Sequence, residues 1–177
     1  MDKSFLEDEC GESLGGRIRR EHHEVDRLEI DHSEAKHSGR TLTGEGLIHW
    51  DDLVIDYLPD FKLKDPYISS HLTIEDLLTH RSGLGTFYGD LLWYETNYTD
   101  EEVIERLQYL PMTNRFRDQF GYQNTTYMVA AEILKKVTGK TWEEYIRENF
   151  LMPLQMKETA TCGNDLKDQK VAYPMID

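Results

Sequence analysis

The chain has 177 residues, 34 of them acidic and 20 basic, which gives a formal net charge of -14. This length suffices for one domain with a buried core, and the negative field opposes phosphate, so we expect no nucleic-acid partner. Two cysteines, Cys10 and Cys162, are too few for a disulfide framework. No apolar run reaches the roughly 18 residues of a membrane span. The N-terminus lacks the apolar region of a signal peptide, so the sequence predicts a cytoplasmic protein without a membrane span.

Residues 1–46 differ in composition from the rest of the chain. No aromatic residue occurs between Phe5 and Trp50, and the segment is rich in charged residues and histidine. Such a sequence buries too little apolar surface to offset the entropy lost on ordering. We therefore predict a polar, poorly ordered or non-native segment at 1–46 and a partial folded domain at 47–177. The histidines of the segment lack cysteine partners, and no metal or other cofactor is predicted; they are His22, His23, His32 and His37.

The first two predicted helices lie between residues 50 and 80. The sequence WDDLVIDYLPDF at 50–61 predicts one or two helical turns that end at Pro59, because proline cannot continue the hydrogen-bond ladder. A second helix is predicted at 74–80, since Thr73 and Asp76 have the spacing of a capping box. It ends in the sequence His-Arg-Ser-Gly-Leu-Gly at 80–85.

The next two helices are predicted from similar signals. Thr99 and Glu102 form a second capping box, before an apolar stripe that Pro111 closes. A helix at 124–137 follows, with Gly139 placed to stop it in the left-handed conformation.

A last helix begins at a third capping box, Thr141 and Glu144, and ends before Pro153. Strand signals are nearly absent, and only KVAYPMI at 170–176 is typical of a strand. We expect a helical cluster over 47–155. The residues predicted to share its core are Leu77, Leu78, Val129, Ile133 and Ile146.

Tyr122, Gln123 and Asn124 stand just before the helix at 124–137. A phenol beside a buried ammonium loses its proton more easily, and it could then accept a proton from a serine hydroxyl during acyl transfer. The Asn124 amide could orient the substrate or the same ammonium. A different interpretation stays open at this point, in which Asn124 is a helix N-cap beside a packed aromatic ring.

Three stretches together resemble the serine β-lactamase-like hydrolase family, which includes class C β-lactamases, penicillin-binding proteins and esterases. They are LTIEDLLTHRSGLG at 72–85, GYQN at 121–124 and YMVAAEILKKVTGKTWEEYIRENFLMPLQMKET at 127–159. The resemblance implies an α/β parent fold with a helical subdomain, of which this chain holds a mainly α fragment. It also implies hydrolysis of a small-molecule or peptide amide or ester through an acyl-serine intermediate, without a metal. The family's Tyr-x-Asn motif corresponds to Tyr122 and Asn124, which are the predicted catalytic residues.

Two other motifs of the family do not fit. The nucleophile motif, Ser-x-x-Lys, is expected about seventeen residues before Glu45-Gly46, where the sequence reads Glu-Ile-Asp-His. The string from Ser33 to Lys36 lies four residues late and precedes a polar sequence that cannot form an apolar helix. The motif Lys-Thr-Gly or His-x-Gly on a late strand is absent. We therefore expect a truncated or N-terminally altered family member that is inactive as written. The alternative is a non-enzymatic, acidic, helical interaction or regulatory domain.

Overall fold

The described part of the chain is helical. The computed structural model describes residues 42–44, 46–94, 96–157 and 159–161. The named elements are α2 (Val54–Tyr57), α3 (Pro66–His71), α4 (Ile74–Leu78), α5 (Asp90–Trp93), α6 (Asp100–Arg106), η2 (Leu107–Tyr109), α7 (Thr125–Thr138), α8 (Trp142–Ile146) and the π-helix η3 (Arg147–Leu151). Within the described residues no strand forms, and isolated bridges join Leu53 to Thr73 and Leu84 to Met112. The expected mainly α fragment is therefore confirmed.

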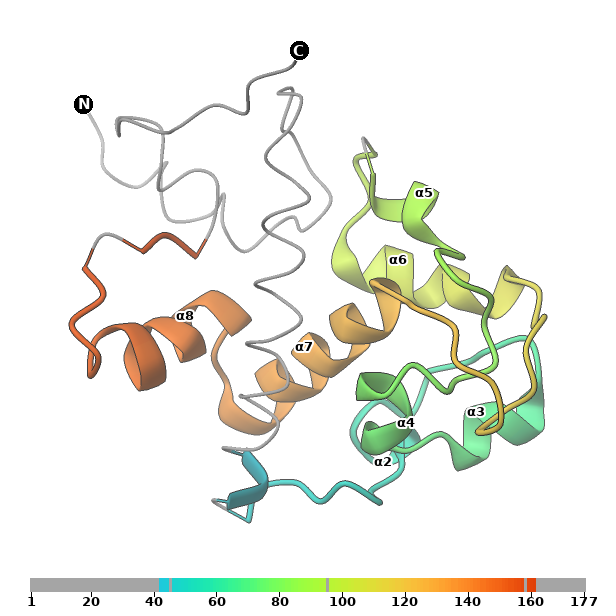
Figure 1. Ribbon diagram of the computed structural model, residues 1–177, viewed down its shortest axis with the longest axis horizontal. Helices are drawn as coiled ribbons and strands as arrows, with labels where there is room; N and C mark the ends of the chain where they lie inside the picture. Colours follow the sequence, from blue (N-terminus) through green and yellow to red (C-terminus); the bar gives the residue numbers. More distant parts are fainter. Residues whose placement is uncertain (1–41, 45, 95, 158, 162–177) are drawn as a thin grey trace.

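The helix α7 is the longest of these elements and lies at the centre of the described structure (Figure 1). It packs against α4 and α2 on one side and α6 on another, and it is followed directly by α8. Its predicted bounds were correct to one residue. It ends at Gly139, whose φ of 71° is left-handed and whose N–H donates to the Lys135 carbonyl at 2.9 Å.

All three predicted capping boxes are present in the structure. In the box that begins α4, the Thr73 hydroxyl accepts from the Asp76 N–H at 3.3 Å, and the Asp76 carboxylate accepts from the Thr73 N–H at 3.1 Å. These bonds satisfy donors that a helix start otherwise leaves without partners. The three pairs are Thr73 with Asp76, Thr99 with Glu102, and Thr141 with Glu144.

Some helix bounds differ from the prediction. The helix α4 ends at Leu78, two residues early, because His80 adopts a left-handed φ of 59° that no α-helix can contain. The helix α3 was not predicted, although Asp65 caps it by accepting from the Tyr67 N–H at 2.8 Å and Pro66 occupies its first turn.

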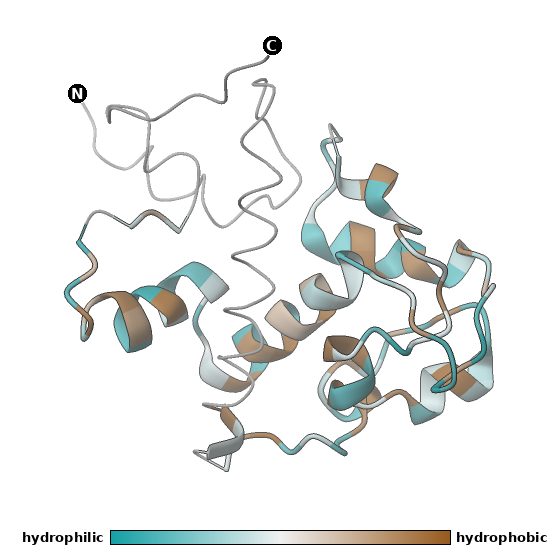
Figure 2. Ribbon diagram, in the orientation of Figure 1, coloured by the Kyte–Doolittle hydropathy of each residue, from teal (hydrophilic) through white to brown (hydrophobic). Residues whose placement is uncertain are grey.

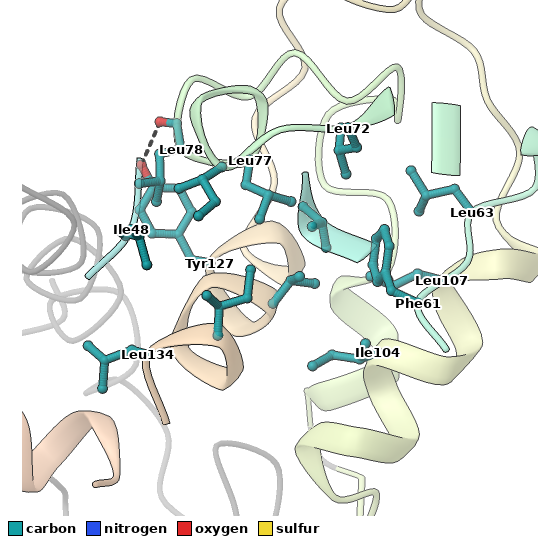
Figure 3. Packing of buried hydrophobic residues seen from close by; sticks show 14 of the residues in the cluster. Ile48, Phe61, Leu63, Leu72, Leu77, Leu78, Ile104, Leu107, Tyr127 and Leu134 are labelled. Carbon is teal, nitrogen blue, oxygen red and sulfur yellow. Dashed lines mark hydrogen bonds between the residues drawn. The ribbon is translucent and has the colours of Figure 1, made fainter. Parts of the chain in front are cut away.

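The core forms where α4 and the elements before it pack on α7 (Figures 2 and 3). Apolar side chains from α4, α6 and α7 point into it, and the Tyr127 hydroxyl donates to the Leu78 carbonyl at 3.0 Å. Such a bond satisfies a buried phenol without interrupting the apolar contact. The predicted core residues are all buried: Leu77, Leu78, Val129, Ile133 and Ile146.

Several predictions fall outside the described residues. Ser33, Lys36 and the four N-terminal histidines lie there, as does the strand expected at 170–176. Leu42 is buried in the core cluster, and the boundary at residue 46 stays a prediction. Within the part of the chain that the structure covers, no helix combines the length and apolar character needed to cross a bilayer.

Candidate functional site

The sequence His-Arg-Ser-Gly forms the turn that follows α4. The left-handed conformation of His80 reverses the chain, and the Arg81 N–H donates to the Asp76 carbonyl at 3.0 Å. The reversal leaves the His80 side chain buried, at 5% exposure. A buried imidazole normally needs hydrogen-bond partners within the protein. The partners of His80 therefore identify the segment that this turn contacts.

The His80 turn holds the segment that contains Tyr122. The Gly121 N–H donates to the His80 carbonyl at 3.0 Å, and the Gln123 N–H donates to the His80 Nδ1 at 3.1 Å. The two segments approach so closely that a Cβ on Gly121 would lie 2.3 Å from the Leu84 carbonyl oxygen. Only glycine permits this approach. The motif at 121–124 is thus fixed in place by the motif at 80–85.

Tyr122 lies between two rings and is half-buried. Its ring centroid is 4.9 Å from that of His80 and 5.4 Å from that of Phe87, in an edge-on contact. The Tyr122 carbonyl accepts from the Phe87 N–H at 2.9 Å. Phe87 itself has a left-handed φ of 61° and is 59% exposed, an uncommon conformation for a bulky residue. The Tyr122 ring is therefore held by packing, and the residue as a whole is only partly buried.

Asn124 is buried, at 6% exposure, and its amide is oriented by a carboxylate. The Asn124 Nδ2 donates to the Asp90 Oδ2 at 3.0 Å. Its Oδ1 has no hydrogen-bond partner among the described residues. The side chain makes no capping bond to α7, and the backbone at Asn124 is already helical. Asn124 therefore stands at the N-cap position of α7 but does not cap the helix through its side chain.

Asp90 is a residue of this site that the sequence did not reveal. It begins α5 and lies 34 positions before Asn124. Because Asp90 accepts from the amide nitrogen, the amide oxygen must point the other way, which settles the orientation of the group. The sequence around Asp90, a glycine followed by the start of a short helix, does not indicate that its carboxylate binds the Asn124 amide.

A second tyrosine, Tyr127, packs on the same imidazole, with the ring centroids 5.1 Å apart. Its hydroxyl donates to the Leu78 carbonyl, and burial, followed by the charge that Tyr122 can carry, raises its pKa. Tyr127 therefore holds its proton more firmly than an ordinary tyrosine. Of the two tyrosines that pack on His80, Tyr127 is buried with its hydroxyl bonded to the Leu78 carbonyl, and Tyr122 is the less buried.

An ion pair between the buried Asp76 carboxylate and Arg117 braces the segment that precedes Tyr122. Asp76 is 1% exposed and accepts from Arg117 at both Nε and a terminal nitrogen, the latter at 2.8 Å. Arg81 approaches the same carboxylate at 3.5 Å, and the Arg117 N–H donates to the Arg81 carbonyl at 3.0 Å. The pair was not predicted, because its members lie 41 residues apart.

The structure places the Tyr122 ring against His80 and Phe87, and the Asn124 amide against Asp90. Within the described ranges no group of three or more His, Cys, Asp or Glu side chains is arranged to hold a metal ion. The arrangement offers a phenol on a partly buried residue and a buried amide oxygen. Chemically it can receive a proton and accept a hydrogen bond from a donor brought to it.

Comparison with known proteins gives consistent results. Residues 41–175 match the family model described as Beta-lactamase. Penicillin-binding protein 4* of Bacillus subtilis is 27% identical over 140 residues, which cover 75% of this chain and 29% of that protein. The chain thus spans less than a third of the length of this relative.

Solved structures agree with the match. The octameric penicillin-binding protein homologue from Pyrococcus abyssi superposes with a TM-score of 0.65 at 27% identity, covering 80% of this chain and 33% of that one. A D-stereospecific amidohydrolase from Streptomyces sp. superposes with a TM-score of 0.59 at 20% identity, covering 74% of this chain and 41% of that one. The second likeness shows the fold alone.

Proposed function

Because the chain belongs to the beta-lactamase family, we propose that it supplies one side of an active site that hydrolyses amides or esters through an acyl-serine intermediate. Tyr122 is the proton acceptor of this site, and Asn124 orients the groups around it. The substrate class is a small-molecule or peptide amide or ester. A relative named as a penicillin-binding protein supports this class, at 27% identity.

The observation that carries the proposal is the state of the Asn124 amide. Its nitrogen is held by Asp90, while its oxygen is buried without a partner among the described residues. Leaving a buried acceptor without a donor costs about 1–3 kcal/mol, so nearly all buried acceptors in native proteins have a hydrogen-bond partner. A lysine ammonium or a substrate N–H is the donor that suits this oxygen. The Asn124 Oδ1 is thus held in position to accept a hydrogen bond from such a donor.

The role of Tyr122 follows from the same arrangement. In the proposed site a lysine ammonium lies near both Tyr122 and Asn124, and a nearby positive charge favours phenolate. Tyr127 is unsuited to the role, because its hydroxyl is committed to the Leu78 carbonyl and burial raises its pKa. Tyr122 is therefore the phenol that exchanges a proton with a serine hydroxyl and a leaving group.

We propose further that this chain as given has no turnover. Acyl transfer needs a nucleophile, a proton acceptor and an oxyanion hole in one geometry. Tyr122 and Asn124 supply only one part of it. The Ser-x-x-Lys string from Ser33 to Lys36 is out of register by four residues, about one helical turn. A missing nucleophile is not compensated by binding groups, so activity should be near background.

The test is an assay of the purified chain with nitrocefin and with a p-nitrophenyl ester, beside the variant Tyr122→Phe. We expect no burst with either substrate and the same background rate for both proteins. A fluorophosphonate or penicillin probe is then added, and labelled peptides are identified by mass spectrometry. Covalent labelling of Ser33, or turnover lost in Tyr122→Phe, would overturn the proposed inactivity and restore a complete enzyme.

A non-enzymatic interaction domain is the second candidate, and exposed apolar side chains around the site favour it. Leu91 is 83% exposed, and Phe87 and Phe120 are more than half exposed. Such side chains favour association when they adjoin one another. Sedimentation velocity over a range of concentrations tests this candidate. Reversible association that Leu91→Ser weakens would support it, and a monomer at every concentration would speak against it.

A further inference from the structure

The contacts of His80 point to a role beyond packing. We infer that His80 is a positioning residue that holds the Tyr122–Asn124 motif in place only while its imidazole is neutral. The inference rests on the proposed function for its catalytic meaning. Its geometry stands on the hydrogen bond from the Gln123 N–H to the His80 Nδ1, at 3.1 Å.

This hydrogen bond requires one protonation state of the ring. A backbone N–H can only donate, so the His80 Nδ1 must offer its lone pair, and the proton of the neutral ring lies on Nε2. In the imidazolium form both nitrogens carry protons, and Nδ1 can no longer accept. Protonation of His80 therefore turns the contact with Gln123 from attraction to repulsion between two donors.

Gln123 is the residue through which the effect reaches the site. It is fully buried, it stands between Tyr122 and Asn124, and its side-chain amide donates to the Gly85 carbonyl. A buried N–H that loses its acceptor is costly to leave without a partner, so the peptide that joins Tyr122 to Gln123 must move. Tyr122 adjoins that peptide and Asn124 follows Gln123 directly, so we expect both to leave their present positions.

Three aromatic rings of the described residues pack on the imidazole. Its ring centroid lies 4.9 Å from that of Tyr122, 5.1 Å from that of Tyr127 and 5.4 Å from that of Phe120. Two of these rings are phenols, which titrate, and burial raises the pKa of Tyr127. The charged groups of the adjoining turn are Asp76, Arg81 and Arg117, which pair with one another.

Two variants separate the acceptor from the ring. His80→Asn keeps an acceptor oxygen near the position of Nδ1, lacks a titrating group, and suits the left-handed φ of 59°. His80→Phe keeps an aromatic ring of similar size and has no acceptor. If the ring has only a structural role, the phenylalanine variant should protect the Gln123 amide as the original chain does. If His80 acts through Nδ1, the asparagine variant should protect that amide and the phenylalanine variant should not.

The experiment measures amide hydrogen exchange by NMR on the full chain, with ¹⁵N spectra of the histidine ring, as the pH is lowered until His80 protonates. We expect the Gln123 amide to lose about tenfold or more of its protection as the ring titrates, since one hydrogen bond is lost. In His80→Asn the amide should stay protected throughout, and in His80→Phe it should be unprotected throughout. The Val129 amide, within α7, is the internal control for global unfolding.

The inference is overturned if Gln123 keeps its protection across the His80 titration, or if His80→Phe retains it at neutral pH. Should His80→Phe fail to fold, exchange at Val129 reveals this, and the comparison of the original chain with His80→Asn still decides. None of these measurements needs turnover. Failure of the positioning role is therefore distinct from failure of the proposed hydrolase site, which the ester and probe experiments address.

Discussion

The guanidinium of Arg117 binds the carboxylate of Asp76: the Arg117 Nε donates to Oδ1 at 3.1 Å and to Oδ2 at 2.9 Å. A terminal nitrogen of Arg117 also donates to the His71 carbonyl at 2.8 Å. Asp76 meanwhile completes the capping box of α4. One buried carboxylate thus joins the start of α4 to a segment 41 residues later, and that segment leads into Tyr122.

Loss of this ion pair should be costly. Arg117→Ala leaves Asp76 buried with only the more distant Arg81, and removal of one partner of a buried pair costs about 3–5 kcal/mol. Because Arg117 itself is partly exposed, we expect a loss nearer 2–4 kcal/mol. Arg115→Ala is the matched control, since its pair with Asp118 is exposed and should contribute about 0–1 kcal/mol. Urea melts of both variants measure the difference; equal losses would rule out a special role for Arg117.

Leu78 tests the interface between α4 and α7. Its side chain is buried in the core cluster, so Leu78→Ala should lower the free energy of unfolding by about 2–5 kcal/mol. Leu91→Ala removes the same atoms from an exposed position and should change stability by less than about 0.5 kcal/mol. Denaturant melts compare the two. A loss below about 1 kcal/mol for Leu78→Ala would place that side chain outside the working core.

Gly121 tests how closely the His80 turn and the Tyr122 segment must approach. The Cβ of an alanine there would lie 2.3 Å from the Leu84 carbonyl oxygen and 2.6 Å from the Asn114 amide nitrogen. Since one of these atoms belongs to the backbone, we expect Gly121→Ala to cost about 1–3 kcal/mol or more. Gly44→Ala, where no atom lies within 4 Å of the new Cβ, is the control. Thermal melts should separate the two variants clearly, and similar melting temperatures would contradict the close approach.

Asp100 should make stability depend on pH. Burial, followed by repulsion from Glu101, Glu143 and Glu132, raises the pKa of its carboxyl to about 6. An acid whose pKa is raised by folding destabilises the folded state when ionised. The penalty is complete above pH 6, is relieved as the pH falls toward the ordinary value of 3.8, and amounts to at most about 3 kcal/mol.

The variant Asp100→Asn removes this penalty. We expect it to be more stable than the original chain at a pH of about 7.5, by roughly 1–3 kcal/mol, and to lose that advantage near pH 4. Asp51→Asn makes the same change at an exposed position and should show little difference at either pH. Urea melts at the two pH values provide the measurement. An advantage that persists unchanged at low pH would show that the carboxyl does not titrate as described.

Features encoded within a few residues could be predicted from the sequence. The capping box at Thr73 and Asp76 and the stop at Gly139 depend on neighbours three to five positions away, so their signals are local. The periodic apolar residues of α7 likewise identified its buried face, including Val129 and Ile133. The end of α4 was placed too late, because the left-handed turn at His80 depends on what the imidazole meets.

The candidate site depends on pairs that are distant in the sequence. Tyr122 and Asn124 could be named from their motif, but nothing in the sequence connects Asn124 with Asp90, or the Gln123 N–H with His80. The contact with His80 forms where α4 packs on α7, and the contact with Asp90 forms where α5 meets the start of α7. The side-chain identities were visible, and their spatial partners were not.

The segment from Thr86 to Pro111 is held at both of its ends, which affects how its sequence and length can change. At these ends, which form its base, Gly85 accepts from the Gln123 amide, Phe87 donates to the Tyr122 carbonyl, and Leu84 pairs with Met112. The excursion that carries α5 and α6 therefore leaves and re-enters the structure at adjoining points. Because loop-closure entropy grows only slowly with length, residues added in the loop between α5 and α6 should disturb stability little, whereas Asp90 and the buried side chains of α6 must be kept. The segment can therefore vary in length at that loop while its base keeps Tyr122 in place.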